Sequence, residues 1–174
     1  MKLPSIQTLE KIYGESEISG KRYESLAQNF KENFGTEEME FFTSPGRTEI
    51  VGNHTDHNGG KILAGSISMD TIGAAYPNGT SEIRIVSEGY KNCIVVDLED
   101  LDNAPKCCGT LSLVAGMMEA AKSAGYKTGG FNAYVSTQVI SAAGVSSSAS
   151  FEMLVASIIN YFFNDTKVDR KSVV

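Results

Sequence analysis

The sequence has no tryptophan, only 2 histidines and only 3 cysteines among its 174 residues. The cysteines are Cys93, Cys107 and Cys108, an odd set with neither the even count of a disulfide framework nor the spacing of a zinc site. They are interpreted as free thiols, buried or incidental, in a protein of a reducing compartment.

Long apolar runs are also missing, since serine, asparagine or glycine interrupts each one before the ~18 residues of a membrane-spanning helix. The first residues continue without the apolar segment of a secretion signal. These absences predict a cytoplasmic protein that has no membrane partner.

Positive charge is scarce, with 15 Lys+Arg against 21 Asp+Glu and a net charge of −6. No basic run exceeds a pair, as in Lys21-Arg22, so nucleic acid is not expected as a partner. Hydrophobic residues make up 41 % and charged residues 21 %, which is the composition of a globular chain that buries a core.

Two helical patterns open the chain, at residues 5–13 and 21–34, and each is followed by a glycine suited to a helix C-cap. We expect them to be peripheral packing helices within residues 1–38. Short β-branched segments, a helix, one more strand and a long apolar helix follow. The predicted strands are residues 39–43, 61–64, 71–76, 82–86, 93–97 and 131–135, and the predicted helices are residues 111–123 and about 148–163.

Pro77-Asn78-Gly79 has the composition of a hairpin turn, so the strands at 71–76 and 82–86 are expected to pair antiparallel. Strands cluster before helices, which favours an α+β fold with a mixed or antiparallel sheet packed by helices.

The segment from Gln138 to Ser150 joins a strand to the long apolar helix and contains Ala142-Ala143-Gly144-Val145-Ser146-Ser147-Ser148. Its small residues let a ligand approach the backbone, and the unpaired N–H groups of a helix start favour an anion such as phosphate. No Gly-Lys-Ser/Thr ending is present, so this is not a Walker A loop. The alternative is that the serines only cap a core helix.

A second polar segment, residues 44–60, contains both histidines, His54 and His57, with Asp56 between them. Its directional hydrogen-bonding groups suit a polyhydroxylated ligand. Two alternatives are a metal site at His54, Asp56 and His57, as in a metal hydrolase, and a merely structural polar turn. The planar guanidinium of Arg47 in the same segment suits phosphate.

Together the two segments resemble the galactokinase branch of the GHMP small-molecule kinases. The sugar-binding signature of that family is similar to Pro45-Gly46-Arg47 followed by Gly52-x-His54-Thr55-Asp56-x-Asn58-x-Gly60. Its ATP phosphate loop resembles Gly144-Val145-Ser146-Ser147-Ser148-Ala149-Ser150. The resemblance implies transfer of the γ-phosphoryl group of ATP to the anomeric hydroxyl of galactose. It also implies the family's N-terminal lobe, which is similar to ribosomal protein S5 domain 2.

The resemblance implies a role for each site residue. Arg47 would be catalytic and stabilise charge on the transferred phosphoryl group, and Ser148 would be a ligand of Mg²⁺. The residues expected to bind sugar are Asn53, His54, Asp56 and His57, and those expected to bind ATP are Gly144, Val145, Ser146, Ser147, Ser148 and Ala149.

Three positions depart from the family pattern. Asn53 replaces the usual Glu, Glu49 replaces Asn, and His57 replaces Tyr. Because an amide both donates and accepts hydrogen bonds, Asn53 admits galacturonate or another galactose-like sugar.

The family's catalytic aspartate and third motif lie C-terminal to the phosphate-loop helix. Residues 1–174 are therefore expected to be an N-terminal lobe, with the sugar and ATP loops in residues 39–163 and the C-terminal lobe absent. Such a chain is expected to bind ligands without turnover and to self-associate through its bare face. A sugar and ATP sensor is the alternative function.

Overall fold

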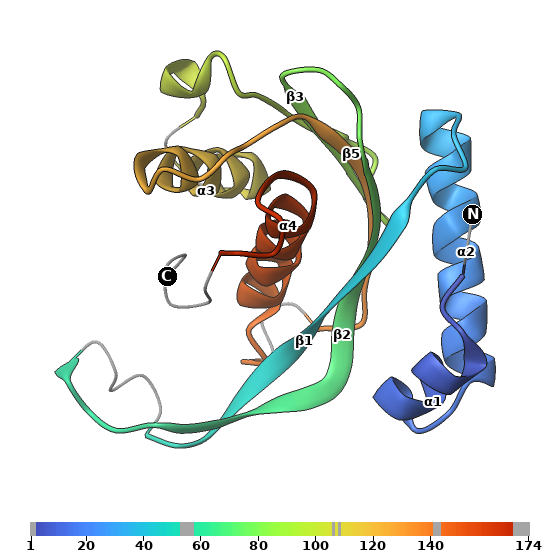
Figure 1. Ribbon diagram of the computed structural model, residues 1–174. Helices are drawn as coiled ribbons and strands as arrows, with labels where there is room; N and C mark the ends of the chain where they lie inside the picture. Colours follow the sequence, from blue (N-terminus) through green and yellow to red (C-terminus); the bar gives the residue numbers. More distant parts are fainter. Residues whose placement is uncertain (1–2, 53–57, 106, 108, 141–143, 169–174) are drawn as a thin grey trace.

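The computed structural model describes residues 3–52, 58–105, 107, 109–140 and 144–168. Its centre is a curved sheet in the order β1-β2-β5-β3-β4 (Figure 1). The strands are β1 (Glu40–Val51), β2 (Leu63–Pro77), β3 (Glu82–Ser87), β4 (Ile94–Asp97) and β5 (Phe131–Thr137). All neighbours pair antiparallel except β3 and β5, which are parallel, so the predicted mixed sheet of an α+β fold is confirmed.

The predicted hairpin between residues 71–76 and 82–86 is wrong, because β5 lies between β2 and β3. Gly130 explains the insertion. Its N–H donates to the Thr80 carbonyl and its carbonyl accepts from the Asn78 N–H, so the turn bonds to β5 instead of closing on itself. A Cβ on Gly130 would lie 2.3 Å from the Thr80 carbonyl oxygen, so this close approach requires glycine.

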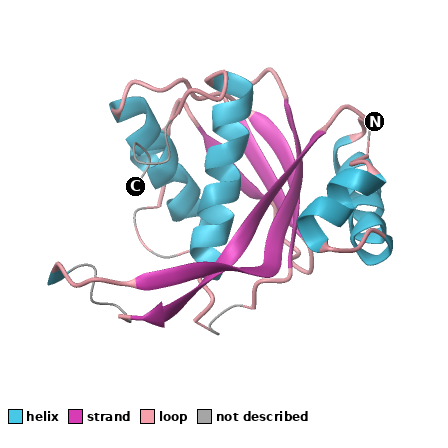
Figure 2. Ribbon diagram, turned by 60° about the horizontal axis from the view of Figure 1, so that its bottom comes forward, coloured by secondary structure: helices cyan, strands magenta, loops and turns pink. Residues whose placement is uncertain are grey.

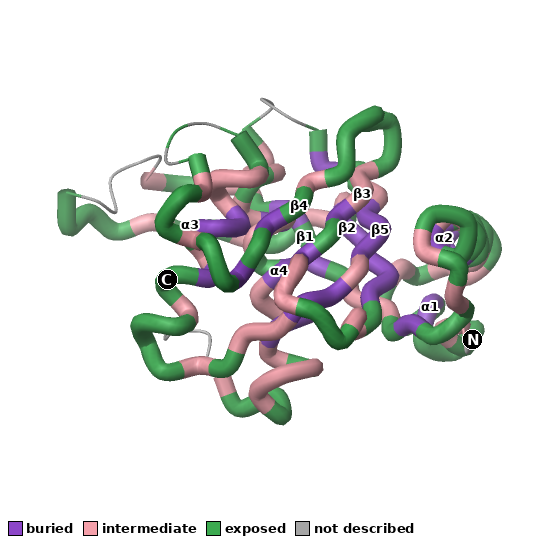
Figure 3. The backbone as a smooth tube through the Cα atoms, turned by 90° about the horizontal axis from the view of Figure 1, so that it is seen from above, coloured by how far each residue is buried: buried purple, intermediate pink, exposed green. Residues whose placement is uncertain are grey.

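Helices cover both faces of the sheet (Figures 1 and 2). On one face lie α1 (Ile6–Tyr13) and α2 (Glu17–Phe34), and on the other lie α3 (Thr110–Ser123) and α4 (Ser147–Phe163). A short 3₁₀ turn, η2 (Leu101–Asn103), precedes α3. Each side has its own apolar core, and buried residues concentrate along the strands between them (Figure 3).

The helix boundaries follow the predicted caps except at α2. Ser5 caps α1 by accepting a hydrogen bond from the Thr8 N–H, and Gly14 ends the helix in the left-handed conformation. Helix α2 begins four residues before the predicted start at Lys21. The carboxylate of Glu15 accepts hydrogen bonds from the N–H groups of Ile18 and Ser19 in the first turn of α2. These otherwise unpaired donors are thereby satisfied, so the helix can begin before Gly20.

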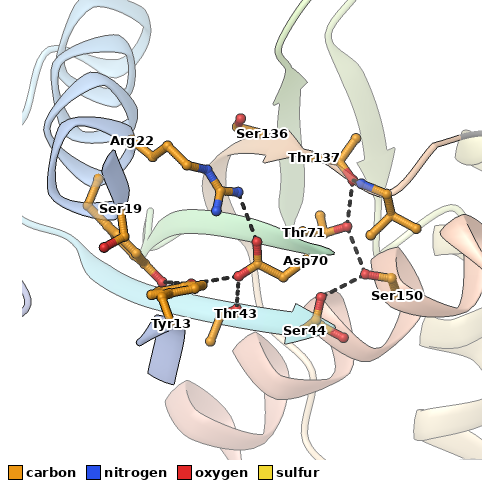
Figure 4. Close-up of polar contacts among 12 residues, drawn as sticks. Tyr13, Ser19, Arg22, Thr43, Ser44, Asp70, Thr71, Ser136, Thr137 and Ser150 are labelled. Atoms are coloured by element: carbon orange, nitrogen blue, oxygen red, sulfur yellow. Dashed lines mark hydrogen bonds and ion pairs between the residues drawn. The ribbon is translucent and has the colours of Figure 1, made fainter. Parts of the chain in front are cut away.

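A buried carboxylate joins the N-terminal helices to the sheet. Asp70 of β2 is only 3 % exposed, and it pairs with Arg22 of α2 at 2.9 Å. Hydroxyls of Tyr13 and Thr43 donate to its other oxygen at 2.6 Å (Figure 4). Burial, followed by the hydrogen bond to Asp70, raises the pKa of Tyr13 above its usual value, so this phenol stays protonated as a donor.

The described residues bear on the expectations about the cysteines and about membrane-spanning helices. Cys93 and Cys107 are free and exposed, so the alternative of burial is wrong for these two. Cys108 lies outside the described residues. No helix in the described part of the chain combines the length and the apolar character needed to cross a bilayer.

Candidate functional site

The two polar segments singled out in the sequence meet in the structure. The backbone N–H of Arg47 in β1 donates to the Val145 carbonyl in the loop before α4, at 3.1 Å. The Ser150 hydroxyl in the first turn of α4 donates to the Ser44 carbonyl at 2.8 Å. Residues about one hundred positions apart thus form two attachments, one on each side of Pro45 and Gly46.

Gly46 makes this close approach possible. A Cβ there would lie 3.0 Å from the Val145 carbonyl oxygen, 3.0 Å from Ile67 Cδ1 and 3.1 Å from Val139 Cγ1. These distances are tighter than ordinary van der Waals contact, so any side chain would push the loop away from the strand. The pairing of β1 with β2 also shifts register between Pro45 and Arg47, which re-aims the strand at this point.

Arg47 is about half exposed, and its guanidinium forms an ion pair with Glu49 at 2.8 Å. Glu49 is one of the departures from the family pattern, and its carboxylate is largely buried, with 12 % of the side chain exposed. The Arg47 end of the pair reaches solvent, so an anion from solution can approach this guanidinium.

The loop before α4 leaves backbone donors at the start of the helix. Gly144 has φ of +72°, and no atom of the described chain lies within 4 Å of where its Cβ would be. The first intrahelical bond of α4 joins the Ser150 N–H to the Ser146 carbonyl at 3.0 Å. The N–H groups of Ser147, Ser148 and Ala149 are therefore not used by the helix itself.

The alternative that these serines only cap the helix does not describe Ser146. This N-cap residue adopts the left-handed conformation, with φ 59° and ψ 50°, and its side chain makes no capping bond within the described part of the chain. A serine that caps in the ordinary way has extended backbone and accepts a bond from the first turn. The Ser146 side chain therefore does not occupy the N–H groups of the first turn of α4.

A cleft of about 770 Å³ opens beside this helix start. Ser147 and Ser148 line it together with Gly109 and Thr110 at the start of α3, so two helix N-termini face one cavity. The N-cap of α3 is Gly109, which has no side chain to cap the helix. Lys91, on the connection between β3 and β4, adds a positive side chain to the wall.

The remaining wall of the cleft comes from strands β2 to β5, the connection between β3 and β4, and the helices α3 and α4. Its other lining residues are Thr71, Ser87, Glu88, Tyr90, Asn92, Ile94, Leu111, Leu113, Val135, Thr137, Phe151 and Glu152. Sequence reasoning identified only Ser147 and Ser148 of this cleft. The only local signal for the rest is Gly109 before α3, because the other residues come together through sheet pairing and helix packing.

The predicted sugar-binding residues Asn53, His54, Asp56 and His57 lie outside the described residues. β1 ends at Val51, and the far ends of β1 and β2 form an arm that extends from the body of the molecule (Figure 2). Gly52 has φ of +92°, and a Cβ would lie 2.3 Å from the Lys61 carbonyl oxygen, so only glycine fits there.

No group of three or more His, Cys, Asp or Glu is placed to hold a metal among the residues that the structure describes. The metal alternative named His54, Asp56 and His57, which are not described, so the structure does not address it.

The fold is that of the GHMP kinases. A mevalonate kinase structure from Methanococcus jannaschii covers 78 % of this chain with a TM-score of 0.64, and at 15 % identity the likeness is one of fold alone. The chain covers 44 % of that structure.

Sequence comparison shows which of these kinases the chain resembles. Residues 28–77 match a family model described as the galactokinase galactose-binding signature. The galactokinase of Lactococcus lactis subsp. lactis is 38 % identical over 144 residues, which is 80 % of this chain and 36 % of that protein. A crystal structure of Lactococcus lactis galactokinase complexed with galactose covers 87 % of this chain at 35 % identity, with a TM-score of 0.78. The predicted resemblance to the N-terminal portion of the galactokinases is confirmed, and the chain spans well under half the length of these relatives.

Proposed function

We propose that this chain provides the sugar-binding and ATP-binding parts of a sugar kinase, which transfers the γ-phosphoryl group of ATP to the anomeric hydroxyl of galactose. The observation that carries the proposal is the contact between the Arg47 N–H and the Val145 carbonyl. It joins the strand that leads to the sugar segment to the loop at the nucleotide cleft, as a transfer between two bound substrates requires.

The residues present fit a nucleoside triphosphate and Mg²⁺. The space beside Gly144 is open, the first-turn N–H groups of α4 are not used by the helix, and Lys91 lies in the same cleft. The exposed hydroxyl of Ser148 is the group proposed to hold Mg²⁺, which prefers oxygen ligands and usually binds between protein and phosphate. Bound Mg²⁺ would neutralise charge on the phosphates.

Arg47 is proposed to stabilise charge on the transferred phosphoryl group. Its backbone bonds to the loop, whereas its half-exposed guanidinium pairs with Glu49 among the described residues. Exchange of Glu49 for a phosphoryl oxygen would place the planar fork of Arg47 on the reacting group.

Asn53, His54, Asp56 and His57 are proposed to bind the sugar hydroxyls. Galactose is the proposed sugar, because the family match covers this segment and a similar structure holds galactose. Galacturonate is the second candidate, since Asn53 can donate a hydrogen bond to a carboxylate whereas the usual Glu would repel it. The cytoplasmic location expected from the sequence belongs to the same proposal.

The test is calorimetry on the purified chain with Mg-ATP and with a panel of hexoses and uronic acids. Saturable binding of Mg-ATP and of galactose or galacturonate is expected. Asn53→Glu should shift the preference toward galactose by about fivefold, which corresponds to one altered hydrogen bond of about 1 kcal/mol. Absence of any sugar or nucleotide binding by a folded chain would contradict the proposed function. An unchanged sugar ranking would show that residue 53 does not contact the substrate.

We also propose that the chain self-associates through the face beside α4. An apolar groove of about 450 Å³ runs between α3 and α4, lined by residues such as Met117, Ala156 and Ile159. Gly116→Glu should favour the monomer, because no atom of the described chain lies within 4 Å of its Cβ position and the new carboxylate would enter the groove. Replacing glycine inside a helix stabilises it by up to ~1 kcal/mol, so folding should not suffer. Light scattering that reports a wild-type monomer would contradict this proposal.

A further inference from the structure

A row of hydroxyls, buried except at Thr137, connects the sheet to the helix at the proposed nucleotide cleft (Figure 4). Ser150 Oγ in α4 lies 2.8 Å from the Ser44 carbonyl oxygen and 2.8 Å from Thr71 Oγ1 in β2. Thr71 Oγ1 lies 2.8 Å from Thr137 Oγ1 in β5, and the Val139 N–H donates to Thr137 Oγ1 at 3.1 Å.

The two ends of the row fix the direction of every bond in it. A carbonyl can only accept, so Ser150 uses its single hydroxyl proton on Ser44, and it must accept from Thr71. Thr71 then accepts from Thr137, which in turn accepts from the Val139 N–H. All the hydrogen bonds therefore run in one direction along the row, and each bond polarises and strengthens its neighbour. Loss of one hydroxyl therefore weakens the adjacent bonds as well.

The row is buried at its α4 end. Ser150, Thr71 and Ser44 are 2 %, 1 % and 5 % exposed, so water cannot readily replace a missing partner there, whereas Thr137 at the other end is exposed. Asp70 and its partners lie on the other face of β1 and β2, so they do not contribute to the contact with α4 (Figure 4).

We propose that Ser150, Thr71 and Thr137 are positioning residues that set the first turn of α4 against β1, and so fix the phosphate loop relative to Arg47. The inference rests on the proposed function. Ser150 is two residues from Ser148, and Thr71 and Thr137 themselves line the cleft with Ser147 and Ser148. The only other backbone bond between these segments among the described residues is that from Arg47 to Val145. Without the row, this bond is the remaining hydrogen bond between β1 and the loop among the described residues, while the later turns of α4 stay packed on the sheet through its apolar core.

The experiment compares ligands with and without phosphates. Mg-ATP needs the loop in place, whereas adenosine contacts only the rest of the cleft, so NMR titration of the full chain with each separates positioning from general loss of structure. Ser150→Ala and Thr71→Val remove one hydroxyl each and nearly preserve side-chain volume. The matched control is Ser157→Ala on the same helix, where the exposed hydroxyl donates only to the Met153 carbonyl at 2.7 Å.

We expect Ser150→Ala and Thr71→Val to weaken Mg-ATP binding about tenfold. Because Ser150 does not line the cleft, Ser150→Ala should leave adenosine binding unchanged. Thr71→Ser keeps the hydroxyl and should restore most of the affinity. Ser157→Ala should bind both ligands as the wild type does. Should Ser150→Ala fail to fold, Thr137→Val at the next link carries the test, with an expected threefold to tenfold loss for Mg-ATP.

Two results would overturn the inference while the proposed function stands: equal losses for Mg-ATP and adenosine, which indicate a merely structural role, and unchanged Mg-ATP binding in a folded Ser150→Ala. A wild-type chain that is folded but binds no Mg-ATP would overturn the proposed function and this inference with it.

Discussion

Valine in place of Gly144 is expected to lower the affinity for Mg-ATP at least about a hundredfold. The backbone there has φ of +72°, which costs an ordinary L-residue about 1–2 kcal/mol and a β-branched one more. No protein atom of the described chain lies within 4 Å of the Cβ position, so the new side chain would not clash with the protein. It would instead occupy the space proposed for the phosphates, and calorimetry with Mg-ATP measures the loss.

Gly125→Val is the matched control for Gly144→Val. Gly125 also has a positive φ, +83°, with open space around its Cβ position, but it lies at the far end of α3 and does not line the cleft. Its replacement should strain the backbone equally and leave nucleotide binding intact. Ser148→Ala removes only the proposed Mg²⁺ ligand, so its effect should be smaller than that of Gly144→Val. Unchanged affinity in both loop variants would contradict the assignment of this loop to phosphate.

Alanine in place of Asp70 is expected to reduce the free energy of unfolding by about 3–5 kcal/mol, the usual cost of leaving a buried charge without its partner. Arg22 would lose the carboxylate at 2.9 Å, and the Tyr13 and Thr43 hydroxyls would lose their acceptor. Because a domain is commonly stable by only about 5–15 kcal/mol, the variant would be close to unfolding. Denaturant titration followed by circular dichroism measures the change.

Two further variants show whether the charge itself causes that loss. Asp165→Ala breaks the exposed pair with Lys167, whose side chains are 84 % and 80 % exposed, and should change stability by no more than about 1 kcal/mol. Adding Arg22→Met to Asp70→Ala removes the uncompensated cation and should recover part of the lost stability. If the double variant is less stable than Asp70→Ala alone, the loss comes from packing rather than from the unpaired charge.

Local chemistry made most helices predictable. Gly14 and Gly35 end α1 and α2 in the left-handed conformation that their positions suggested. The apolar helix at α4 and its small-residue approach were also evident, and so was the strand that leads to it. These features depend on neighbours in sequence, which is why the sequence alone shows them.

Features that depend on distant partners were not predictable in this way. Pro77-Asn78-Gly79 has the composition of a hairpin, yet its polar groups bond to Gly130, which no local pattern reveals. The same holds for Asp70 and Thr71: neither stood out in the sequence, because a single polar residue in an apolar strand does not name its partner. The sugar segment was recognised by resemblance, and its four predicted residues stay a prediction.

The central place of β5 has a consequence for the order in which the protein can fold. The β1–β2 and β3–β4 pairs are each made from neighbouring segments, so they can form early with little loss of chain entropy. Neither pair contacts the other through strand hydrogen bonds until β5 enters between them. On the ribosome, a chain that has emerged only as far as η2 therefore exposes two unjoined half-sheets with open edges, a state prone to wrong pairing. Synthesis of β5 is the event that converts them into one sheet.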